Sequence, residues 1–168
     1  ASDEDFAAKV GEYVDLDEFA RYFAVLVWIA NQDSLLQIGQ NYYVYLHPAT
    51  HKLLFIPWDQ DFSFGNFRLR AGSESWTIFS PWSNANPFLA RLYAVDAFRD
   101  AYLAYMVEFT GTIFRPERFA EQMARIAPAL RPAVEEEGAM WLPGFDAVAN
   151  GSSGILPFVK ARAAFVAS

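Results

Sequence analysis

The fold is decided by the stretch NYYVYLHPATHKLLFIPWDQD, which occupies residues 41–61. Residues 42–46 are aromatic and β-branched, a composition that favours a strand. Residues 47–51 carry a proline between two histidines and predict a turn, and residues 52–57 predict the returning strand. We therefore expect one β-hairpin with polar residues at its base.

Helices are predicted on both sides of this hairpin. Asp15 is expected to cap a helix that runs to about Ala30, because Glu18 follows three residues later as in a capping box. This helix is apolar nearly all round, which predicts a place in the core. The other expected helices run from Pro87 to about Thr110, from Pro116 to about Glu137, and from Pro157 to about Val166.

Irregular structure is expected between these helices. Residues 66–86 show no hydrophobic period, and residues 144–154 resemble a loop. Residues 1–10 are a polar leader with no start signal, and no strand is expected around them. Pro128 and Pro132 should kink or split the helix that contains them. The prediction is one domain over residues 1–168, of the α+β class but mainly helical.

Composition excludes several classes of protein. The 168 residues are 54% hydrophobic and 17% aromatic, which excludes a disordered chain. The net charge of −7 disfavours nucleic acid as a partner. The longest apolar run, residues 22–30, is far shorter than the roughly 20 residues that span a bilayer, so no membrane partner is expected.

Two further features concern the chain as a whole. It contains no cysteine, which excludes disulfides and thiolate metal sites. It begins with Ala1 and carries no signal peptide, so we expect a processed or excised piece of a longer protein.

Four polar residues are the candidate functional site. Asp33 follows the first predicted helix, Asn41 precedes the first strand, and Asp59 and Asp61 follow the second. Because the start of one hairpin strand neighbours the end of the other, Asn41 and Asp59 should lie side by side. Asp59 and Asp61 share a face if their segment is extended. Carboxylates gathered without a Lys or Arg repel one another, and a divalent cation such as Mg²⁺ or Ca²⁺ would relieve this.

Each of these residues also has a structural interpretation. Asp33 as a turn cap and Asn41 as a loop residue are the alternatives, and Asp61 is the carboxylate expected to be a bystander if one is. His47 and His51 are expected to be exposed turn histidines rather than metal ligands. Arg68 and Arg70 are expected to be surface charges rather than phosphate contacts.

The order of these elements matches the protein kinases. A kinase has a buried helix, a catalytic Asp, a metal-binding Asn, a short hairpin and a second metal-binding Asp. Here Asp33, Asn41 and Asp59 follow that order. The spacing departs from it, because seven residues separate Asp33 from Asn41 where the kinase motif has four.

The chain resembles the spore-coat CotH kinase family over about Tyr13 to Val166. The resemblance is carried by Asn31-x-Asp33, by Asn41-Tyr42-Tyr43-x-Tyr45, and above all by Ile56-Pro57-Trp58-Asp59-x-Asp61-x-x-Phe64-Gly65. It implies a protein-kinase-like C-lobe with one small hairpin. It also implies magnesium-dependent transfer of the ATP γ-phosphate to Ser or Thr of a protein, in a spore-coat, secreted or cell-surface context.

The resemblance also implies residue roles. Asp33 would orient and deprotonate the acceptor hydroxyl, while Asn41 and Asp59 would bind the cofactor ATP through magnesium. Asp61 would hold a second ion or cap the following turn. The family's amino-terminal lobe, with its ATP-clamping lysine, is expected before this sequence, since Lys9 is the only lysine ahead of Asp33. The chain alone is therefore expected to be inactive.

Two other functions compete with this one. The first is a non-catalytic kinase-like module that binds a protein. The second is a metal-assisted hydrolase that uses the same carboxylates. Ser-His-Asp catalysis has no support, because neither histidine lies near a nucleophile motif.

Overall fold

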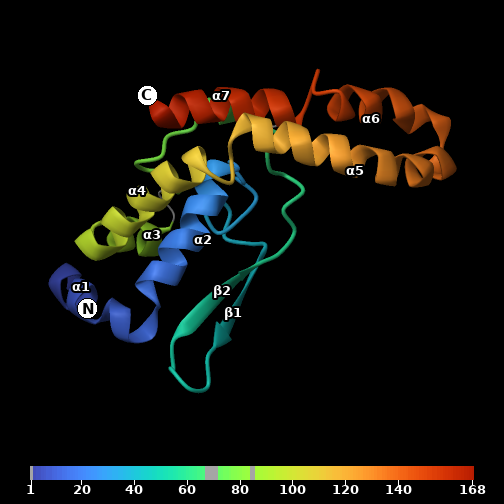
Figure 1. Cartoon of the computed structure of the whole chain (residues 1–168). Helices are drawn as coiled ribbons and strands as arrows, with labels where there is room; N and C mark the ends of the chain where they lie inside the picture. The colour runs from blue at the N-terminus through green and yellow to red at the C-terminus, as the bar shows by residue number, and fades with distance from the viewer. Residues whose placement is uncertain (1, 67–71, 84–85) are drawn as a thin grey trace.

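The computed structural model describes residues 2–66, 72–83 and 86–168. This part of the chain is mainly helical and holds a single two-stranded sheet, so the predicted α+β class is confirmed (Figure 1). The elements are α1 (Asp3–Tyr13), α2 (Leu16–Trp28), β1 (Tyr42–Leu46), β2 (Leu53–Pro57), α3 (Pro87–Tyr93), α4 (Asp96–Gly111), α5 (Pro116–Glu137), α6 (Leu142–Ala149) and α7 (Ile155–Ala167), with 3₁₀ turns η1 (Ser73–Ser75) and η2 (Ala139–Trp141).

Helix α2 forms the centre of the core, as its apolar sequence predicted. Its cap is the predicted one, because the Asp15 carboxylate accepts a hydrogen bond from the Glu18 amide at 3.2 Å. Phe23 is fully buried against α4, where it meets the rings of Phe98 and Tyr102. Such edge-to-face ring pairs fix the contact between the two helices as well as bury it.

The predicted hairpin is confirmed. Strands β1 and β2 pair antiparallel, with Tyr42 opposite Pro57 and Leu46 opposite Leu53. The ring of Phe55 packs against the core at a centroid distance of 4.4 Å from Phe19. The opposite face of the hairpin is exposed, and the hairpin extends away from the helices (Figure 1).

The helix expected over residues 87–110 is two helices. Helix α3 begins at the predicted Pro87 and is capped by Asn86, but the chain is extended at Val95, and α4 begins at Asp96. The polar segment over residues 1–10 forms most of a helix that was not predicted, since α1 begins at Asp3. Ser2 caps α1, and the acidic residues in its first turn stabilise the helix by interacting with the positive end of its dipole.

The last third of the chain differs most from expectation. Helix α5 runs through Pro128 and Pro132 without splitting, because both lie on an exposed helix where water can satisfy the freed carbonyls. Residues 144–154 are not a loop throughout, because α6 covers Leu142–Ala149. The last helix begins at Ile155, two residues before the predicted Pro157.

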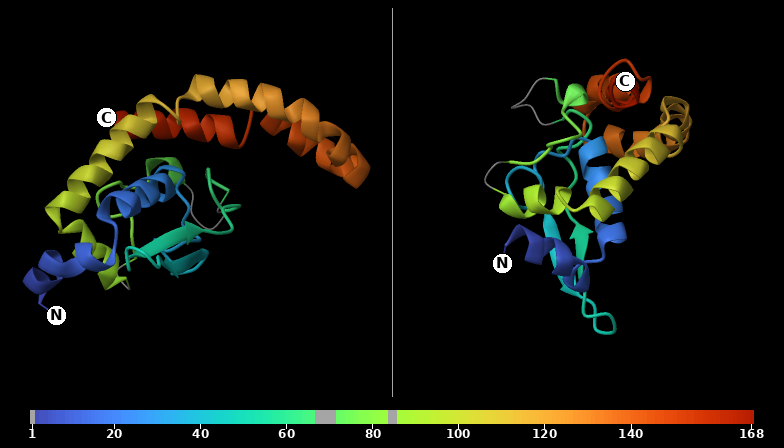
Figure 2. Two further views of the ribbon diagram at one scale, coloured as in Figure 1. Left: turned by 60° about the horizontal axis from the view of Figure 1, so that its bottom comes forward. Right: turned by 90° about the vertical axis from the view of Figure 1, so that its left-hand side faces the viewer.

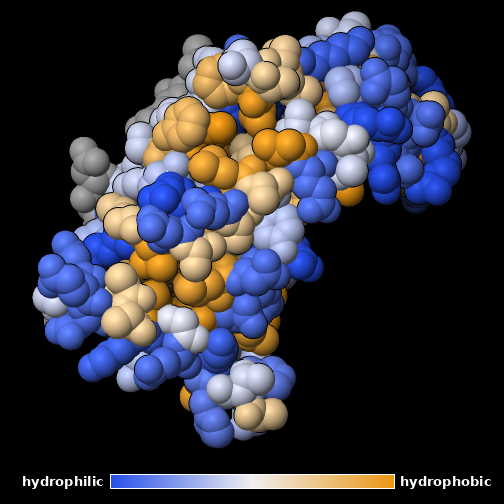
Figure 3. All heavy atoms as spheres, turned by 60° about the vertical axis from the view of Figure 1, so that its left-hand side comes forward, coloured by the Kyte–Doolittle hydropathy of each residue, from blue (hydrophilic) through white to orange (hydrophobic). Residues whose placement is uncertain are grey.

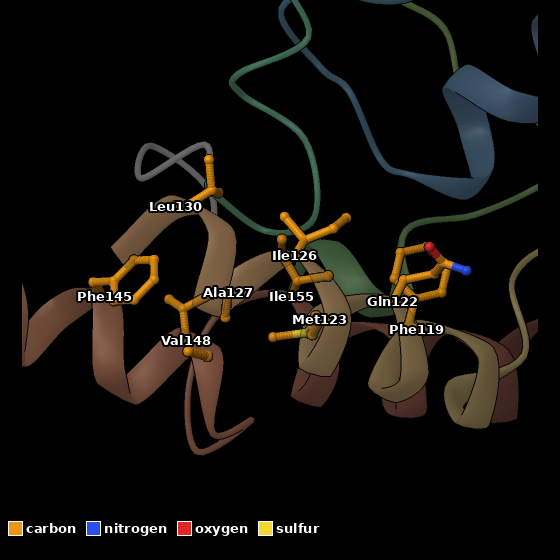
Figure 4. Close-up of a pocket in the computed structure, with 10 residues that line it drawn as sticks. Phe119, Gln122, Met123, Ile126, Ala127, Leu130, Phe145, Val148 and Ile155 are labelled. Atoms are coloured by element: carbon orange, nitrogen blue, oxygen red, sulfur yellow. The ribbon is translucent and has the colours of Figure 1, made fainter. Parts of the chain in front are cut away.

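Helices α5 and α6 form an arm that projects beyond the rest of the molecule (Figure 2). With the start of α7 they line an open apolar pocket of about 250 Å³, and Met123, Phe145 and Ile155 are among its lining residues (Figure 4). On one face of the molecule, apolar residues form a band through the middle and polar residues gather toward the ends (Figure 3). No described helix is both long and apolar enough to span a bilayer.

Candidate active site

Asp33 and Asn41 are in direct contact. The Asn41 side-chain nitrogen donates to the main-chain carbonyl of Asp33 at 2.6 Å and to its Oδ2 at 3.0 Å. Asp33 is only 8% exposed, so its carboxylate depends on protein donors for much of its solvation. Asn41 has a φ of +60°, a left-handed conformation that asparagine tolerates better than most residues.

The longer spacing between these two residues is accommodated by a folded loop. The carbonyl of Ser34 accepts hydrogen bonds from the amides of Gln37 and Gly39, which turns the chain back toward Asp33. The Ser34 hydroxyl also donates to the Asn31 carbonyl at 2.7 Å. The additional residues are therefore absorbed in a turn, and Asn41 still reaches Asp33.

Gln40 is a member of this site that the sequence did not predict. Its side-chain nitrogen donates to Asp33 Oδ1 at 2.6 Å, opposite the bond from Asn41 to Oδ2. A glutamine in a polar loop carries no periodic or motif signal. Its position beside Asn41 was the one clue available.

The hairpin base lies beside Asn41, as the strand order predicted. The amide of Trp58 donates to the Asn41 carbonyl at 3.0 Å, and Asp59 is the next residue. The expected extended segment is wrong in its backbone, because Asp59 has a φ of +46° and a turn begins at Asp61. The two exposed carboxyls nevertheless lie close enough for Asp59 to raise the pKa of Asp61.

Within the carboxyl pair Asp59 and Asp61, the pKa of Asp61 is shifted by its surroundings. The pKa of the Asp61 carboxyl is raised above its ordinary value, first by desolvation and then by the adjacent Asp59. Asp33 contributes to the same shift, so the charges of both other carboxylates act on Asp61. Within the described residues, none of the three forms an ion pair with a Lys or Arg.

Buried amides connect the Asp33 loop to the Asp59 loop. Asn31 is fully buried and donates to Gln60 Oε1 at 2.8 Å, and Gln60 donates in turn to the Trp58 carbonyl at 2.6 Å. The amide of Phe64 also donates to the Ile29 carbonyl at 2.8 Å. The two loops are thus held together independently of the hairpin.

Arg162, on α7, holds the end of α2 directly before the Asp33 loop. Its side chain is fully buried and donates to the carbonyls of Val27 and Trp28, the last residues of α2, and to those of Glu74 and Trp76. Burial lowers the pKa of Arg162 to about 10. Four carbonyl dipoles therefore take the place of a counter-ion, and α7 is bound to the start of the Asp33 loop.

The remaining sequence candidates have structural roles or lie outside the described residues. His47 Nδ1 accepts hydrogen bonds from the amides of Ala49 and Thr50, which makes it a turn residue, and His51 is exposed. Arg68 and Arg70 lie outside the described residues. Across the part of the chain that is described, no three His, Asp or Glu side chains cluster closely enough to hold a metal by themselves.

The donor chemistry at the site nonetheless suits a hard cation. Asp59 and Asp61 offer carboxylate oxygens at an exposed position, where desolvation and then the charge of Asp59 raise the Asp61 pKa. Asn41 turns its nitrogen to Asp33, which leaves its amide oxygen as a possible ligand. Oxygen donors of this kind are those that Mg²⁺ takes together with water and phosphate.

A mainly helical lobe with a hairpin between two acidic loops has the element order of the protein kinases. The comparison with known families agrees: the chain matches the family described as CotH kinase protein over residues 1–166, and it belongs to that family. It is 26% identical over 129 residues to the inner spore coat protein H of Bacillus subtilis (strain 168). That match covers 77% of this chain and 34% of the relative, so the chain spans about a third of the relative's length.

Proposed function

We propose that this chain is the catalytic lobe of a protein kinase that transfers the γ-phosphate of ATP, with magnesium, to Ser or Thr of a protein. The observation that carries the proposal is the clamped carboxylate of Asp33 beside an acidic hairpin base. Phosphoryl transfer needs little covalent chemistry from the protein, because positioning and charge stabilisation supply most of the acceleration.

Asp33 would act on the acceptor hydroxyl. Each of its carboxylate oxygens accepts one amide hydrogen bond and retains a further lone pair for a substrate proton. Among the described residues, no Lys or Arg forms an ion pair with it, so its free lone pairs are not occupied by a cation. Asp33 can therefore both orient the hydroxyl and take its proton.

Asn41 and Asp59 would hold magnesium, and Asp61 would hold a second ion or cap the turn that it begins. Magnesium supplies the positive charge that the transferred phosphoryl group requires. The two-point contact of Asn41 with Asp33 directs its amide oxygen to the other side. That orientation would place the ion and the catalytic carboxylate on opposite ends of one asparagine.

The exposed face of the hairpin supports the proposal that a further lobe of the complete protein lies against it. Tyr43, Tyr45, Ile56 and Trp58 are all 47% exposed or more, directly beside Asn41 and Asp59. We propose that ATP and an amino-terminal lobe of the complete protein cover this face. That lobe would supply the phosphate-clamping lysine, while residues 1–168 form one lobe. The relative's name suggests a spore-coat setting for the complete protein.

The second candidate is a non-catalytic kinase-like module that binds a protein. The exposed hairpin face favours it as well, because contiguous apolar surface beside a polar rim is typical of interaction sites. The two candidates differ in whether Asp33 is needed for chemistry.

Transfer of radiolabelled phosphate from ATP to a Ser-rich acceptor by the complete protein tests the proposal. Asp33→Asn should lower kcat by at least about 100-fold, since it removes the base but keeps the shape. Asp96→Asn, which changes an exposed carboxylate paired with Arg99, is the matched control and should leave kcat unchanged. A complete protein that is inactive on every acceptor, or an Asp33→Asn variant that is fully active, would contradict the kinase proposal.

The metal is tested separately by calorimetry. Asp59→Asn should weaken the binding of magnesium and ATP by roughly tenfold or more, the scale of a lost contact in a metal site. The 168-residue chain alone should show little or no transfer, because it lacks the proposed clamp. Unchanged binding in Asp59→Asn would place the ion elsewhere.

A further inference from the structure

The carboxylate of Asp33 is held at both oxygens. Asn41 donates to Oδ2 and Gln40 donates to Oδ1, so two consecutive side chains grip opposite sides of one group. A carboxylate on one hydrogen bond can still rotate about its Cβ–Cγ bond, where the torsional preference is broad. A second donor on the other oxygen fixes the plane of the group.

We propose that Gln40 is a positioning residue for Asp33, which sets the direction in which the carboxylate presents its free lone pairs. The inference rests on the proposed function, because that direction matters only if Asp33 receives a substrate proton. An amide is suited to the task, since it donates without carrying a charge. A lysine or arginine at this position would orient Asp33 equally well but would stabilise its charge and weaken it as a base.

The loop is built to deliver Gln40 to Asp33. Gly39 has a φ of +71°, and its amide donates to the Ser34 carbonyl at 3.0 Å, which closes the turn directly before Gln40. Gln40 itself is exposed, with no core contact to satisfy. The Gln40 side chain therefore contributes to orientation rather than to packing, and it can be replaced without disturbing the fold.

Gln37 provides a matched control within the same loop. Its side-chain nitrogen donates to the Pro81 carbonyl at 3.2 Å and does not contact Asp33. Gln40→Met and Gln37→Met each remove one amide donor at nearly constant length. Only the first removes a donor from Asp33.

NMR of the 168-residue chain tests the contact without any assay of activity. One Nε2 proton of Gln40 should resonate downfield of a free amide proton. Asp33→Ala should return it to the free position, whereas Gln37→Met should leave it unchanged. A Gln40 amide at the free position in the unmodified chain would overturn the proposal. The same holds if the amide does not respond to Asp33→Ala.

Kinetics of the complete protein test the consequence. Gln40→Met should lower kcat by roughly 10- to 100-fold, the cost of a misplaced reacting group, with KM for ATP and acceptor within about twofold. It should have no further effect on kcat in an Asp33→Asn background, and Gln37→Met should be neutral. An unchanged kcat, or an effect confined to KM, would overturn the proposal. If the NMR result holds while the unmodified protein transfers no phosphate, the proposed function fails and the orientation of Asp33 by Gln40 stands.

Discussion

Asn41 donates its side-chain amide back across eight positions of the chain to both the main-chain carbonyl and the carboxylate of Asp33. One side chain thereby fixes the backbone and the functional group of the same residue. The backbone bond holds the loop closed, and the carboxylate bond couples that closure to the proposed chemistry. Loss of Asn41 should therefore affect stability as well as any metal that it holds.

Replacement of Asn41 should separate its hydrogen bonds from its backbone conformation. Asn41→Ala should lower the free energy of unfolding by about 2–3 kcal/mol, because it removes the bonds and places a Cβ-bearing residue without a polar side chain at a φ of +60°. Asn41→Gly should cost roughly 1 kcal/mol less, since glycine adopts that φ freely. Urea unfolding measures the free energy of unfolding of both variants. Equal losses of stability would show that the left-handed conformation at position 41 carries no strain.

Arg162→Met should be among the most destabilising substitutions in the chain. It removes the guanidinium donor from the carbonyls of Val27, Trp28, Glu74 and Trp76, of which Val27 retains the Ala30 amide, at a cost of about 3–5 kcal/mol. Arg99→Met, which removes an exposed ion pair with Asp96, should cost at most about 0.5 kcal/mol. Comparable urea midpoints for the two variants would contradict this account of Arg162.

Asp61→Asn should stabilise the metal-free chain at neutral pH. The folded-state pKa of Asp61 is raised, so its ionised form is disfavoured by folding. This penalty is fully present above the folded pKa and disappears below the unfolded value near 3.8. The melting temperature of Asp61→Asn should exceed that of the unmodified chain at pH 7 and match it near pH 3.

Magnesium should reverse this advantage if the carboxyl pair binds the ion. At saturating Mg²⁺ the unmodified chain should gain more in melting temperature than Asp61→Asn, because only it keeps both carboxylates. An equal gain for both would assign the ion to other ligands.

Gly65→Ala and Gly111→Ala should have opposite effects. Gly65 has a φ of +80°, and an added Cβ would lie 3.2 Å from the ring of Phe158, so this substitution should cost about 1–2 kcal/mol. Gly111 ends α4 with open space around it, and alanine there should stabilise by about 0.5–1 kcal/mol. Thermal unfolding compares them directly. A neutral Gly65→Ala would mean that the turn after Asp61 adjusts to a side chain.

The parts of the fold with strong local signals were predictable. The cap at Asp15, the apolar sequence of α2 and the aromatic and β-branched composition of the hairpin are properties of neighbouring residues, and each element formed as expected. The break at Val95 and helix α6 were not predicted, because neither carries a strong local signal in the sequence. Pro128 and Pro132 were expected to kink or split α5, and the helix is not split at either, because both are exposed.

The site was predictable in outline and not in detail. Strand order alone placed Asn41 beside the residues that precede Asp59. The contact of Gln40 with Asp33 depends on a turn that Ser34 and Gly39 close through the backbone, which side-chain patterns do not encode. Arg162 was missed because a buried arginine near the chain end looks the same in sequence as an exposed one.

The reach of Arg162 has a consequence for the order of assembly during synthesis. It bonds carbonyls 134 and 135 positions earlier, at the end of α2 and directly before the Asp33 loop. A chain that emerges amino-terminus first would complete the hairpin and both acidic loops long before α7 left the ribosome. The site would form fully only after α7 has been synthesised. Ribosome-bound chains truncated before Arg162 should therefore bind chaperones that released chains containing α7 do not bind.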